Sequence, residues 1–423
     1  MTRVFQKSDF VIKLLNPRLK IIGMDTTHTD GLLVENFEPT DAPMRIAVVT
    51  ETWPPEVNGV ALTLSKLVHL LSQRNHTIQL IRPRQDKNDT GSSPAGWTEI
   101  LLRGLPIPRY PQLKLGMPSK KTLIKAWRHK RPDLIHIATE GPLGWSALQA
   151  AQVLRLPVTS DFRTNFASYS KHYGVGWLSK SIMAYLRKFH NRTSCTMVPT
   201  YALKSQLQAC GFDNLRVVAR GVDTQLFRPE QRNTALRQSW GADDNTMVLL
   251  SAGRLAVEKN LDLIVATDEA LRRKGRQVKL VFAGDGPYRS HLQARCPHAV
   301  FVGMCTHAQL AELYASADLF LFPSLTETFG NVTLEALASG TPVLAFDCAA
   351  ASELIKDAHN GWLVQGEDPQ SYVNKALEIT QIPGALQQAR QHTQSSIRQW
   401  DWQEITTQVE AIFRTTLSSA AKL

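Results

Sequence analysis

The chain has 423 residues, of which 43% are hydrophobic and 20% are charged, and these proportions are typical of a globular protein with a full-sized core. They exclude an intrinsically disordered chain, a collagen and a small disulfide-rich scaffold. At about 100 to 200 residues per domain, this length predicts two or three domains and therefore a cleft between domains.

Charge is distributed unevenly along the chain. The formal net charge is +11, and residues 44–220 hold 25 Lys and Arg against 9 Asp and Glu, whereas residues 221–423 hold 18 against 22. A basic N-terminal half predicts an anionic partner, and both nucleic acid and anionic lipid fit the charge alone. No zinc finger, RNA-binding aromatic pattern or helix-turn-helix signature accompanies the charge, so we do not predict a nucleic-acid partner.

Cysteine and apolar patterns indicate the compartment. The five cysteines are odd in number and never form C-x-x-C, so neither a disulfide framework nor a zinc site is predicted. No uncharged apolar run reaches the roughly 18 residues of a membrane span, and no export signal is visible. We expect a cytoplasmic protein. Residues 1–43 show no sustained periodicity, and we expect a disordered leader or a true start at Met44.

From residue 45 the chain alternates between short apolar runs and amphipathic segments. Ile46–Val49 is typical of a buried strand, and after a loop the apolar residues between positions 62 and 71 recur at helical spacing. The same order follows three later apolar runs. These are Leu134–Ile137, Pro157–Thr159 and Thr196–Pro199. Strands that alternate with helices predict a parallel sheet covered on both faces.

A second series of apolar runs, separated by helical patterns, follows residue 223. Its predicted strands are Met247–Ala252, Lys279–Ala283, Val300–Val302, Leu319–Phe322 and Pro342–Phe346. The predicted fold class is therefore α/β, with two doubly wound Rossmann-like domains facing across a cleft. We place an N-terminal domain at 44–220 and a C-terminal domain at 221–399. Residues 400–423 predict a terminal helix that could pack back on the N-terminal domain.

Two carboxylates follow the predicted strand Leu319–Phe322. Glu327 lies in the loop after the strand, and Glu335 lies about one turn inside a helix that opens near Gly330. Both can face a ligand over the helix N-terminus, where free N–H groups suit an oxygen-rich ligand such as a sugar. Taken singly, Glu327 could be a solvated loop residue, and Glu335 could be favoured only by the helix dipole.

Two cations share the loop after the first strand of the second series. Arg254 and Lys259 could form a clamp for a diphosphate, and the alternative is surface charge with Lys259 paired to Asp262. In the next such loop, Gly284-Asp285-Gly286-Pro287 either brings backbone close to a ligand or is a plain tight turn.

These motifs together resemble a known family. The E-x7-E spacing with Phe329-Gly330, preceded by Gly-Arg-Leu-x3-Lys and Gly-Asp-Gly-Pro, is similar to the retaining glycosyltransferases of family 4, which have the two-domain GT-B fold. The segment from Glu51 to Val60 and the run Asp161–Phe166, with Tyr169 and Tyr173, resemble its mannosyltransferase-like and glycolipid-forming branch. The resemblance extends from about Met44 to about Trp402.

The resemblance implies roles for individual residues. Glu327 would contact the donor sugar at the reaction centre, Glu335 would hold the ribose, and Arg254 and Lys259 would bind the diphosphate, which makes Glu327, Arg254 and Lys259 the catalytic set. Further donor-binding positions are Gly330, Asn331, Val332, Gly303, Met304 and Gly284. The loops expected to approach the phosphate and the acceptor contribute Asn58, Gly59, Arg163, Asn165 and Glu140.

The chain departs from the family pattern in two places. Many relatives have paired glycines where this chain has Asn58-Gly59, and a histidine that acts in several relatives falls on Ala138. Thr139, Glu140, His136 or a substrate phosphate oxygen could replace that histidine, although we expect His136 to be a packed strand-end residue.

We also predict that no metal and no cofactor is required. No D-x-D triplet, the usual metal-carboxylate site for a sugar diphosphate, occurs in the chain. The nucleotide diphosphate sugar would then be a co-substrate, and the cationic clamp would take the place of a metal.

Basic tracts at residues 114–131 and 177–192 suggest where an acceptor docks. The second tract has Leu178, Ile182, Tyr185, Leu186 and Phe189 on one helical face, with basic residues around it. Such a helix could lie in an anionic membrane surface or could be an ordinary domain helix with its apolar stripe in the core. We favour the membrane surface, at the inner face of the cell membrane.

The predicted function is transfer of a hexose to a lipid or lipid-linked acceptor, with mannose from GDP-mannose as the first choice. A UDP-sugar donor, in glucosyl or glucuronosyl glycolipid synthesis, and a soluble or polysaccharide acceptor are the alternatives. A non-transferase GT-B enzyme or a sugar-nucleotide-binding protein is more remote. No oligomeric state is predicted.

Overall fold

The computed structural model describes residues 26–29, 32–35, 42–56, 59–86, 88–91, 97–107, 110–163, 179–325 and 329–421. It divides into two units, Met1–Met44 and Arg45–Leu423. In the first unit, β1 (Thr26–Thr29) pairs antiparallel with β2 (Leu32–Glu35). The second unit contains both of the large parallel sheets.

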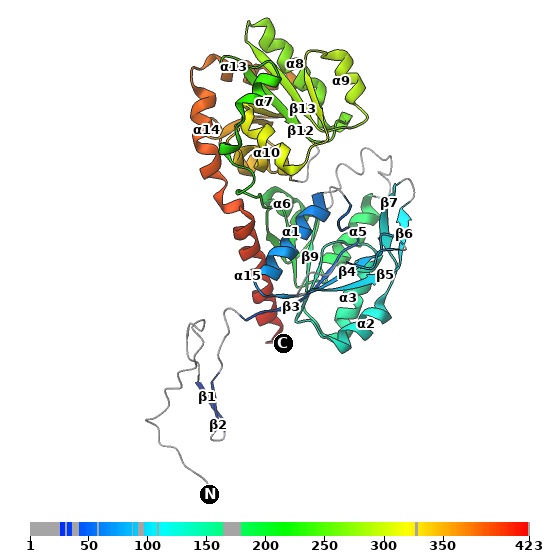
Figure 1. Ribbon diagram of the computed structural model, residues 1–423. Coiled ribbons are helices and arrows are strands. Elements are labelled where there is room, and N and C mark those ends of the chain that lie inside the picture. Colours follow the sequence, from blue (N-terminus) through cyan, green and yellow to red (C-terminus); the bar gives the residue numbers. More distant parts are fainter. Residues whose placement is uncertain are drawn as a thin grey trace. The chain divides into compact units, whose positions relative to one another are not determined.

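The N-terminal half of the second unit contains a seven-stranded parallel sheet (Figure 1). Its strands are β3 (Arg45–Val49), β4 (Thr77–Pro83), β5 (Trp97–Leu102), β8 (Leu134–Ile137), β9 (Val158–Asp161), β10 (Cys195–Val198) and β11 (Leu215–Val217). The helices are α1 (Gly59–Gln73), α2 (Lys120–His129), α3 (Pro142–Leu154), α5 (Ser179–His190) and α6 (Tyr201–Ala209), and β6 (Gly104–Ile107) and β7 (Tyr110–Gly116) form a separate hairpin. The strand order β11-β10-β9-β8-β3-β4-β5 reverses between β3 and β8.

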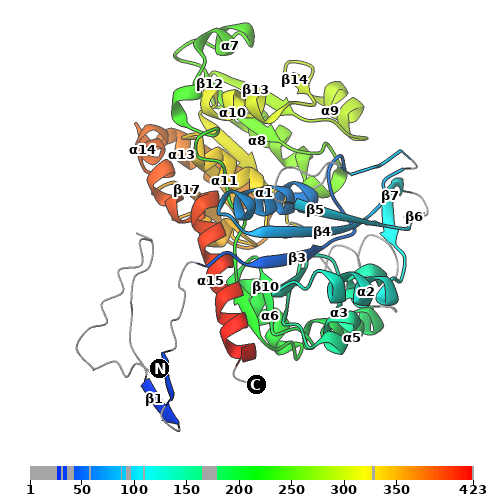
Figure 2. The ribbon, with the colours of Figure 1, turned by 60° about the horizontal axis from the view of Figure 1, so that its bottom comes forward.

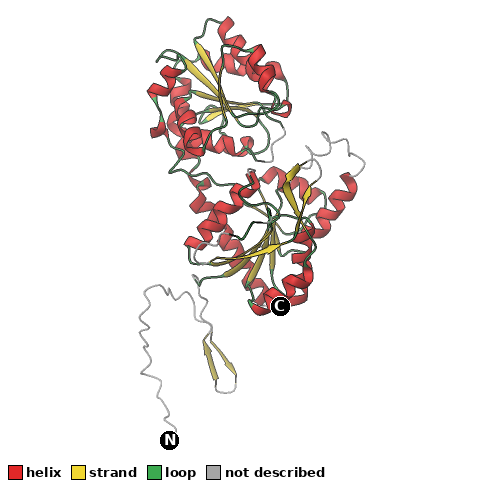
Figure 3. Cartoon of the chain, turned by 45° about the vertical axis from the view of Figure 1, so that its right-hand side comes forward, coloured by secondary structure: helices red, strands yellow, loops and turns green. Residues whose placement is uncertain are grey.

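The C-terminal half contains a six-stranded parallel sheet with helices on both faces (Figure 3). Its strands are β12 (Met247–Ala252), β13 (Val278–Ala283), β14 (Val300–Gly303), β15 (Leu319–Phe322), β16 (Val343–Phe346) and β17 (Gly361–Val364). The helices are α7 (Thr234–Ser239), α8 (Leu261–Arg273), α9 (Arg289–Arg295), α10 (His307–Ser316), α11 (Asn331–Ala338), α12 (Ala351–Leu354), α13 (Pro369–Gln381) and α14 (Ala385–Ser396). The order β14-β13-β12-β15-β16-β17 reverses between β12 and β15, as in a doubly wound fold.

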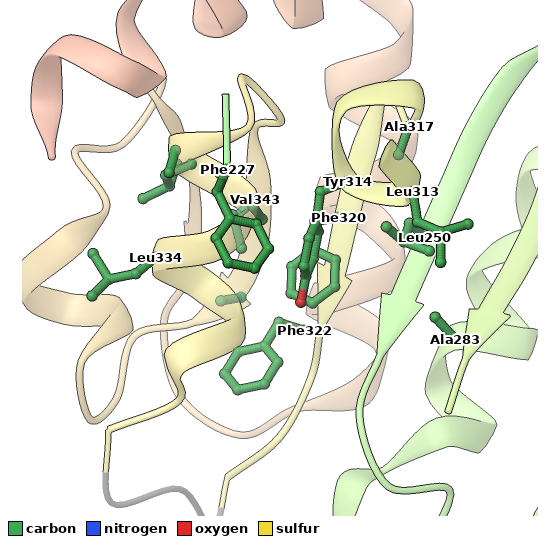
Figure 4. Close-up of a cluster of buried hydrophobic side chains, with 14 of the residues drawn as sticks. Phe227, Leu250, Ala283, Leu313, Tyr314, Ala317, Phe320, Phe322, Leu334 and Val343 are labelled. Atoms are coloured by element: carbon green, nitrogen blue, oxygen red, sulfur yellow. The ribbon is translucent and has the colours of Figure 1, made fainter. Parts of the chain in front are cut away.

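Aromatic packing fixes the strand that carries the predicted Glu327 loop. The ring of Tyr314 lies 6.0 Å from that of Phe227 and 5.4 Å from that of Phe320, measured between centroids (Figure 4). All three side chains belong to a buried cluster on one face of the C-terminal sheet, which also includes Leu334 of α11. Because β15 and α11 are both anchored in this cluster, the ends of the loop between them are held in place.

The last helix, α15 (Trp402–Ala421), packs on the N-terminal half, where it contacts α1 and β9 (Figure 2). The guanidinium of Arg74 donates to Glu410 over 3.2 Å, and the ring of Phe413 lies 5.4 Å from that of His136. The chain therefore returns to its first sheet after completing the second. Among the helices that the structure describes, none is long and apolar enough to cross a membrane.

Candidate active site

A pocket with an open volume of about 630 Å³ lies where the order of the C-terminal sheet reverses. It is lined by residues that follow β12 and β15, and by Val332 of α11. Both predicted cations, Arg254 and Lys259, are among the lining residues. Ligands of open α/β sheets bind at this position, beyond the carboxyl ends of the strands at the point of reversal.

Glycines allow the loops beside this pocket to approach each other. A Cβ on Gly284 would stand 1.9 Å from the carbonyl oxygen of Gly253, and one on Gly286 would stand 2.3 Å from that of Leu255. The Gly253 and Leu255 N–H groups donate to the carbonyls of Ala283 and Asp285, each over 2.9 Å. The Gly284 turn therefore holds the loop that carries Arg254, and Gly284 itself does not line the pocket.

The two cations differ in their surroundings. The side chain of Arg254 is 66% exposed and donates to the carboxylate of Glu258, four residues later, whereas Lys259 ends a short 3-10 helix and is half-buried. Asp262, the suggested surface partner of Lys259, accepts hydrogen bonds from Tyr288, His291 and Arg295. An incoming diphosphate would compete with the half-buried carboxylate of Glu258 for Arg254.

Helix α11 presents the second predicted carboxylate. Gly330 precedes the helix with φ = 82°, a left-handed conformation that favours glycine, and Asn331 and Val332 form its first turn. Further along, the carboxylate of Glu335 accepts a 3.1 Å hydrogen bond from the hydroxyl of Tyr314. Burial raises the pKa of Glu335 to about 7. At neutral pH the side chain is therefore present partly as the acid and partly as the carboxylate, and only the carboxylate accepts hydrogen bonds from both hydroxyls of a diol.

Sequence reasoning missed Ser324, which lines the pocket two residues beyond β15. Its side chain is 3% exposed, and its Oγ has no hydrogen-bond partner among the described residues. A buried hydroxyl without a partner costs free energy unless a ligand supplies the hydrogen bond. Its place in the same loop as Glu327 was the available signal.

Two further donor-binding candidates lie at the edge strand β14. The carbonyl of Gly303 accepts the N–H of Gly284 over 2.8 Å, and the Met304 side chain is 72% exposed. In the sheet order, β14 is separated from β12 by β13, and neither residue lines the pocket.

The point of reversal in the N-terminal sheet carries two further carboxylates, Glu51 after β3 and Glu140 after β8. The Glu51 N–H donates to Thr139 Oγ1 over 2.9 Å, and the Glu51 Oε1 accepts the N–H of Leu143 over 2.8 Å. Burial, with a smaller contribution from Glu140, raises the pKa of Glu51 to about 7. The carbonyl of Glu140 accepts a hydrogen bond from the Tyr185 hydroxyl over 2.6 Å. Sequence analysis named Glu140 and overlooked Glu51.

His136 is a packed strand residue, as predicted. It is buried, and its ring lies 3.0 Å from Thr159 Oγ1 and 3.3 Å from Asp161 Oδ2. Arg163 donates to the same Asp161 oxygen over 2.6 Å, and both neighbours help to lower the pKa of Asp161. Ala138, on which the family histidine falls, is also buried.

Three predicted site residues, Glu327, Asn58 and Asn165, lie outside the described residues. Gly59, the remaining residue of the predicted phosphate loop, begins α1. In the described part of the chain, no group of three or more His, Cys, Asp or Glu side chains could hold a metal ion.

Comparison with known proteins identifies the family. The profile described as Glycosyltransferase Family 4 matches residues 57–226, and that described as Glycosyl transferases group 1 matches residues 246–381. The chain is 34% identical over 329 residues to a GDP-mannose-dependent alpha-mannosyltransferase of Mycobacterium tuberculosis, covering 76% of this chain and 84% of the relative. The chain belongs to glycosyltransferase family 4.

Two further matches place this glycosyltransferase among its relatives. It is 30% identical over 337 residues to an alpha-monoglucosyldiacylglycerol synthase of Streptococcus pneumoniae, covering 77% of this chain and 76% of the relative. Its fold is similar to that of a sucrose-phosphate synthase from Thermosynechococcus elongatus, with a TM-score of 0.72 and 18% identity over 89% of this chain and 100% of that structure. The glycosyltransferase has the GT-B fold, with two Rossmann-like domains.

Proposed function

We propose that this glycosyltransferase moves mannose from GDP-mannose to a lipid or lipid-linked acceptor, with retention of configuration. The observation that carries the proposal is the pocket at the reversal of the C-terminal sheet, which is lined by Arg254, Lys259 and a Ser324 hydroxyl without a partner among the described residues. The similarity to the mycobacterial GDP-mannose-dependent enzyme supports mannose as the transferred hexose.

The two pocket cations and the two predicted carboxylates each have a task in this reaction. Arg254 and Lys259 bind the diphosphate and stabilise the charge that develops on it as its bond to the sugar C1 breaks. Glu335 accepts hydrogen bonds from the ribose diol, and Glu327 orients the sugar hydroxyls. The acceptor oxygen bonds to C1 on the face that the diphosphate leaves, and its proton passes to a phosphate oxygen of the leaving group. The two cations take the place of a metal ion.

The acceptor domain would meet an anionic membrane surface through α2. Most of the basic residues on and next to this helix are exposed. They are Lys120, Lys121, Lys125, Arg128, Lys130 and Arg131. Each such residue contributes about 1 kcal/mol of attraction near an anionic surface. We therefore propose a peripheral protein on the cytoplasmic face of the membrane.

The second basic helix, α5, is less suited to membrane insertion than its sequence pattern suggests. Leu186 and Phe189 of its apolar stripe are buried in the cores of the N-terminal domain. The hydroxyl of Tyr185, on the same stripe, is bound to the Glu140 carbonyl. Leu186 and Phe189 thus pack within the domain while Tyr185 is 40% exposed, and electrostatic docking through α2 is the better-supported arrangement.

A UDP-sugar donor is the second candidate. The pneumococcal relative is named as a synthase of alpha-monoglucosyldiacylglycerol, so a glucosyl lipid product is compatible with the same architecture. A soluble or polysaccharide acceptor is the remaining alternative.

Mass spectrometry tests these choices. The purified protein is incubated with a membrane lipid extract and EDTA, and with GDP-mannose, UDP-glucose, UDP-glucuronate or UDP-N-acetylglucosamine in separate reactions. We expect a new hexosyl lipid with GDP-mannose, at least 100-fold less with Lys259→Gln, and an unchanged amount with the exposed-site control Arg276→Gln. A product with a UDP-sugar alone would replace the donor, and no lipid product with any donor would refute the lipid acceptor.

A further inference from the structure

The segment Arg220–Asp223, which joins the two sheets, is tightly held against the chain that precedes α15. The Val222 N–H donates to the Trp400 carbonyl over 2.9 Å, and the Trp402 N–H donates to the Val222 carbonyl over 3.2 Å. Gly221 lies under the Trp402 indole, since a Cβ there would stand 2.5 Å from a ring carbon. The backbone next to Arg220 is therefore fixed in position.

The same segment is tied to the first helix of the N-terminal half. Asp223 accepts a 2.9 Å hydrogen bond from Lys66 of α1, and this ion pair helps to lower the pKa of Asp223. Two elements, α1 and the start of α15, thus hold the segment from different directions. Such bracing would keep an adjoining side chain in one orientation while substrate binds and product leaves.

The Arg220 guanidinium lies between the first residues of two helices. Its Nη1 is 3.4 Å from Asn331 Oδ1 at the start of α11, and a Cβ on Gly59 at the start of α1 would stand 3.2 Å from the same nitrogen. The positive ends of both helix dipoles therefore lie next to this guanidinium. A cation next to two helix N-termini favours a bound anion.

The contact between Arg220 and Asn331 lies next to the donor pocket. Val332, which follows Asn331, lines that pocket together with Arg254 and Lys259. Arg220 also lines a second, much smaller pocket together with Arg163. An anion held at Arg220 would thus lie between the sugar-nucleotide pocket and the carboxyl ends of the N-terminal strands.

We propose that Arg220 binds the terminal phosphate of the nucleoside diphosphate, as a third cation beside Arg254 and Lys259. The proposal rests on the proposed function, because it assumes a nucleotide diphosphate sugar in the donor pocket. The guanidinium then approaches the leaving group from the N-terminal side of the chain and stabilises it during bond cleavage. The bracing by Lys66 and Trp402 places Arg220 correctly.

Calorimetric titration with GDP and GMP tests this role, because only GDP carries the terminal phosphate. We expect Arg220→Gln to weaken GDP binding about ten-fold or more and to leave GMP binding unchanged. Arg220→Lys should recover part of the loss, since it keeps the charge without the planar fork. Arg216→Gln, which removes an exposed arginine four residues earlier, should bind both nucleotides like the wild type.

The outcomes separate this proposal from the one it rests on. Wild-type protein that binds neither GDP nor UDP would refute the proposed function. Wild-type GDP binding that survives Arg220→Gln unchanged would refute the role of Arg220 alone. An equal loss of GDP and GMP affinity, accompanied by a lower Tm, would assign Arg220 to the structure of the junction and would also refute the proposal.

Discussion

The hydroxyl of Tyr314 donates a 3.1 Å hydrogen bond to the carboxylate of Glu335, and the two residues come from different helices, α10 and α11. This bond stabilises the charged form of Glu335, but burial outweighs it and raises the pKa to about 7. Near neutral pH the residue is therefore present as a mixture of acid and carboxylate. A ribose diol that donates to Glu335 would select the carboxylate.

Nucleotide binding should consequently release a proton from Glu335. The acid form must ionise before it can accept both hydroxyls, so affinity for GDP should rise by about ten-fold from pH 6 to pH 8. Calorimetry in buffers of different ionisation enthalpy measures the released proton. Glu335→Gln should abolish both the pH dependence of GDP affinity and the proton release. Any pH dependence caused by the nucleotide phosphates would remain in this variant. A variant with the same proton release would mean that another group titrates.

Ser324→Ala should weaken donor binding without destabilising the fold. The Ser324 hydroxyl is buried without a partner among the described residues, so its removal leaves the Tm unchanged or raises it. If the hydroxyl binds the donor, KM for the nucleotide sugar should rise about five-fold. Ser339→Ala is the matched control, because Ser339 is also buried and has no side-chain partner in the part of the chain that the structure describes, but does not line the pocket. Equal KM values for the two variants would remove Ser324 from the site.

Five of the six strands of the C-terminal sheet were predicted because they are largely apolar runs, whereas the edge strand β17 was not predicted. Met247–Ala252 and Leu319–Phe322 occur with the predicted bounds. Strand β4 was missed because Gln79 and Arg82 interrupt its apolar pattern, although both are buried. Arg82 is tolerated there because Asp89 and Glu99, from later segments, pair with it at 2.6 and 2.9 Å. The ion pairs that allow a charged residue in this strand come from tertiary contacts, which cannot be read from the local pattern of apolar residues.

In the candidate site, too, some residues could be predicted from the local sequence and others could not. Arg254 and Lys259 were predictable because they follow a strand directly, and parallel strands end at one edge of the sheet. Glu51 was not, because its burial depends on Leu143 and on the missing side chain of Gly141, whose Cβ would stand 1.9 Å from a Glu51 oxygen. The Glu51 carboxylate also accepts a backbone hydrogen bond from Gly116, so three segments must come together before that carboxyl group becomes unusual.

The Gly284 turn should tolerate no side chain. A Cβ at this position would stand 1.9 Å from the Gly253 carbonyl oxygen, so Gly284→Ala must displace the loop of Arg254. We expect a loss of about 3 kcal/mol in the free energy of unfolding and a loss of transferase activity. Gly275→Ala is the control, because Gly275 also has positive φ, at 75°, but no atom within 4 Å of a Cβ, and it should cost about 1 kcal/mol. Similar losses for the two variants would contradict the close approach.

Glu51 should make stability depend on pH. Its pKa is about 7 in the folded state against 4.5 for the ordinary group, so the folded protein binds the proton more tightly than the unfolded chain. The contribution of Glu51 to stability is therefore largest below pH 4.5, falls as the pH rises to about 7, and stays constant above it; the total change is about 3 kcal/mol.

Glu51→Gln lacks this loss, so its free energy of unfolding relative to the wild type should increase between pH 5 and pH 8. Urea denaturation at both pH values measures the difference, with Glu404→Gln on the exposed face of α15 as the control. If the Glu51 and Glu404 variants show the same pH dependence, then Glu51 is hydrated in the folded protein and the three segments around it do not close as the structure shows.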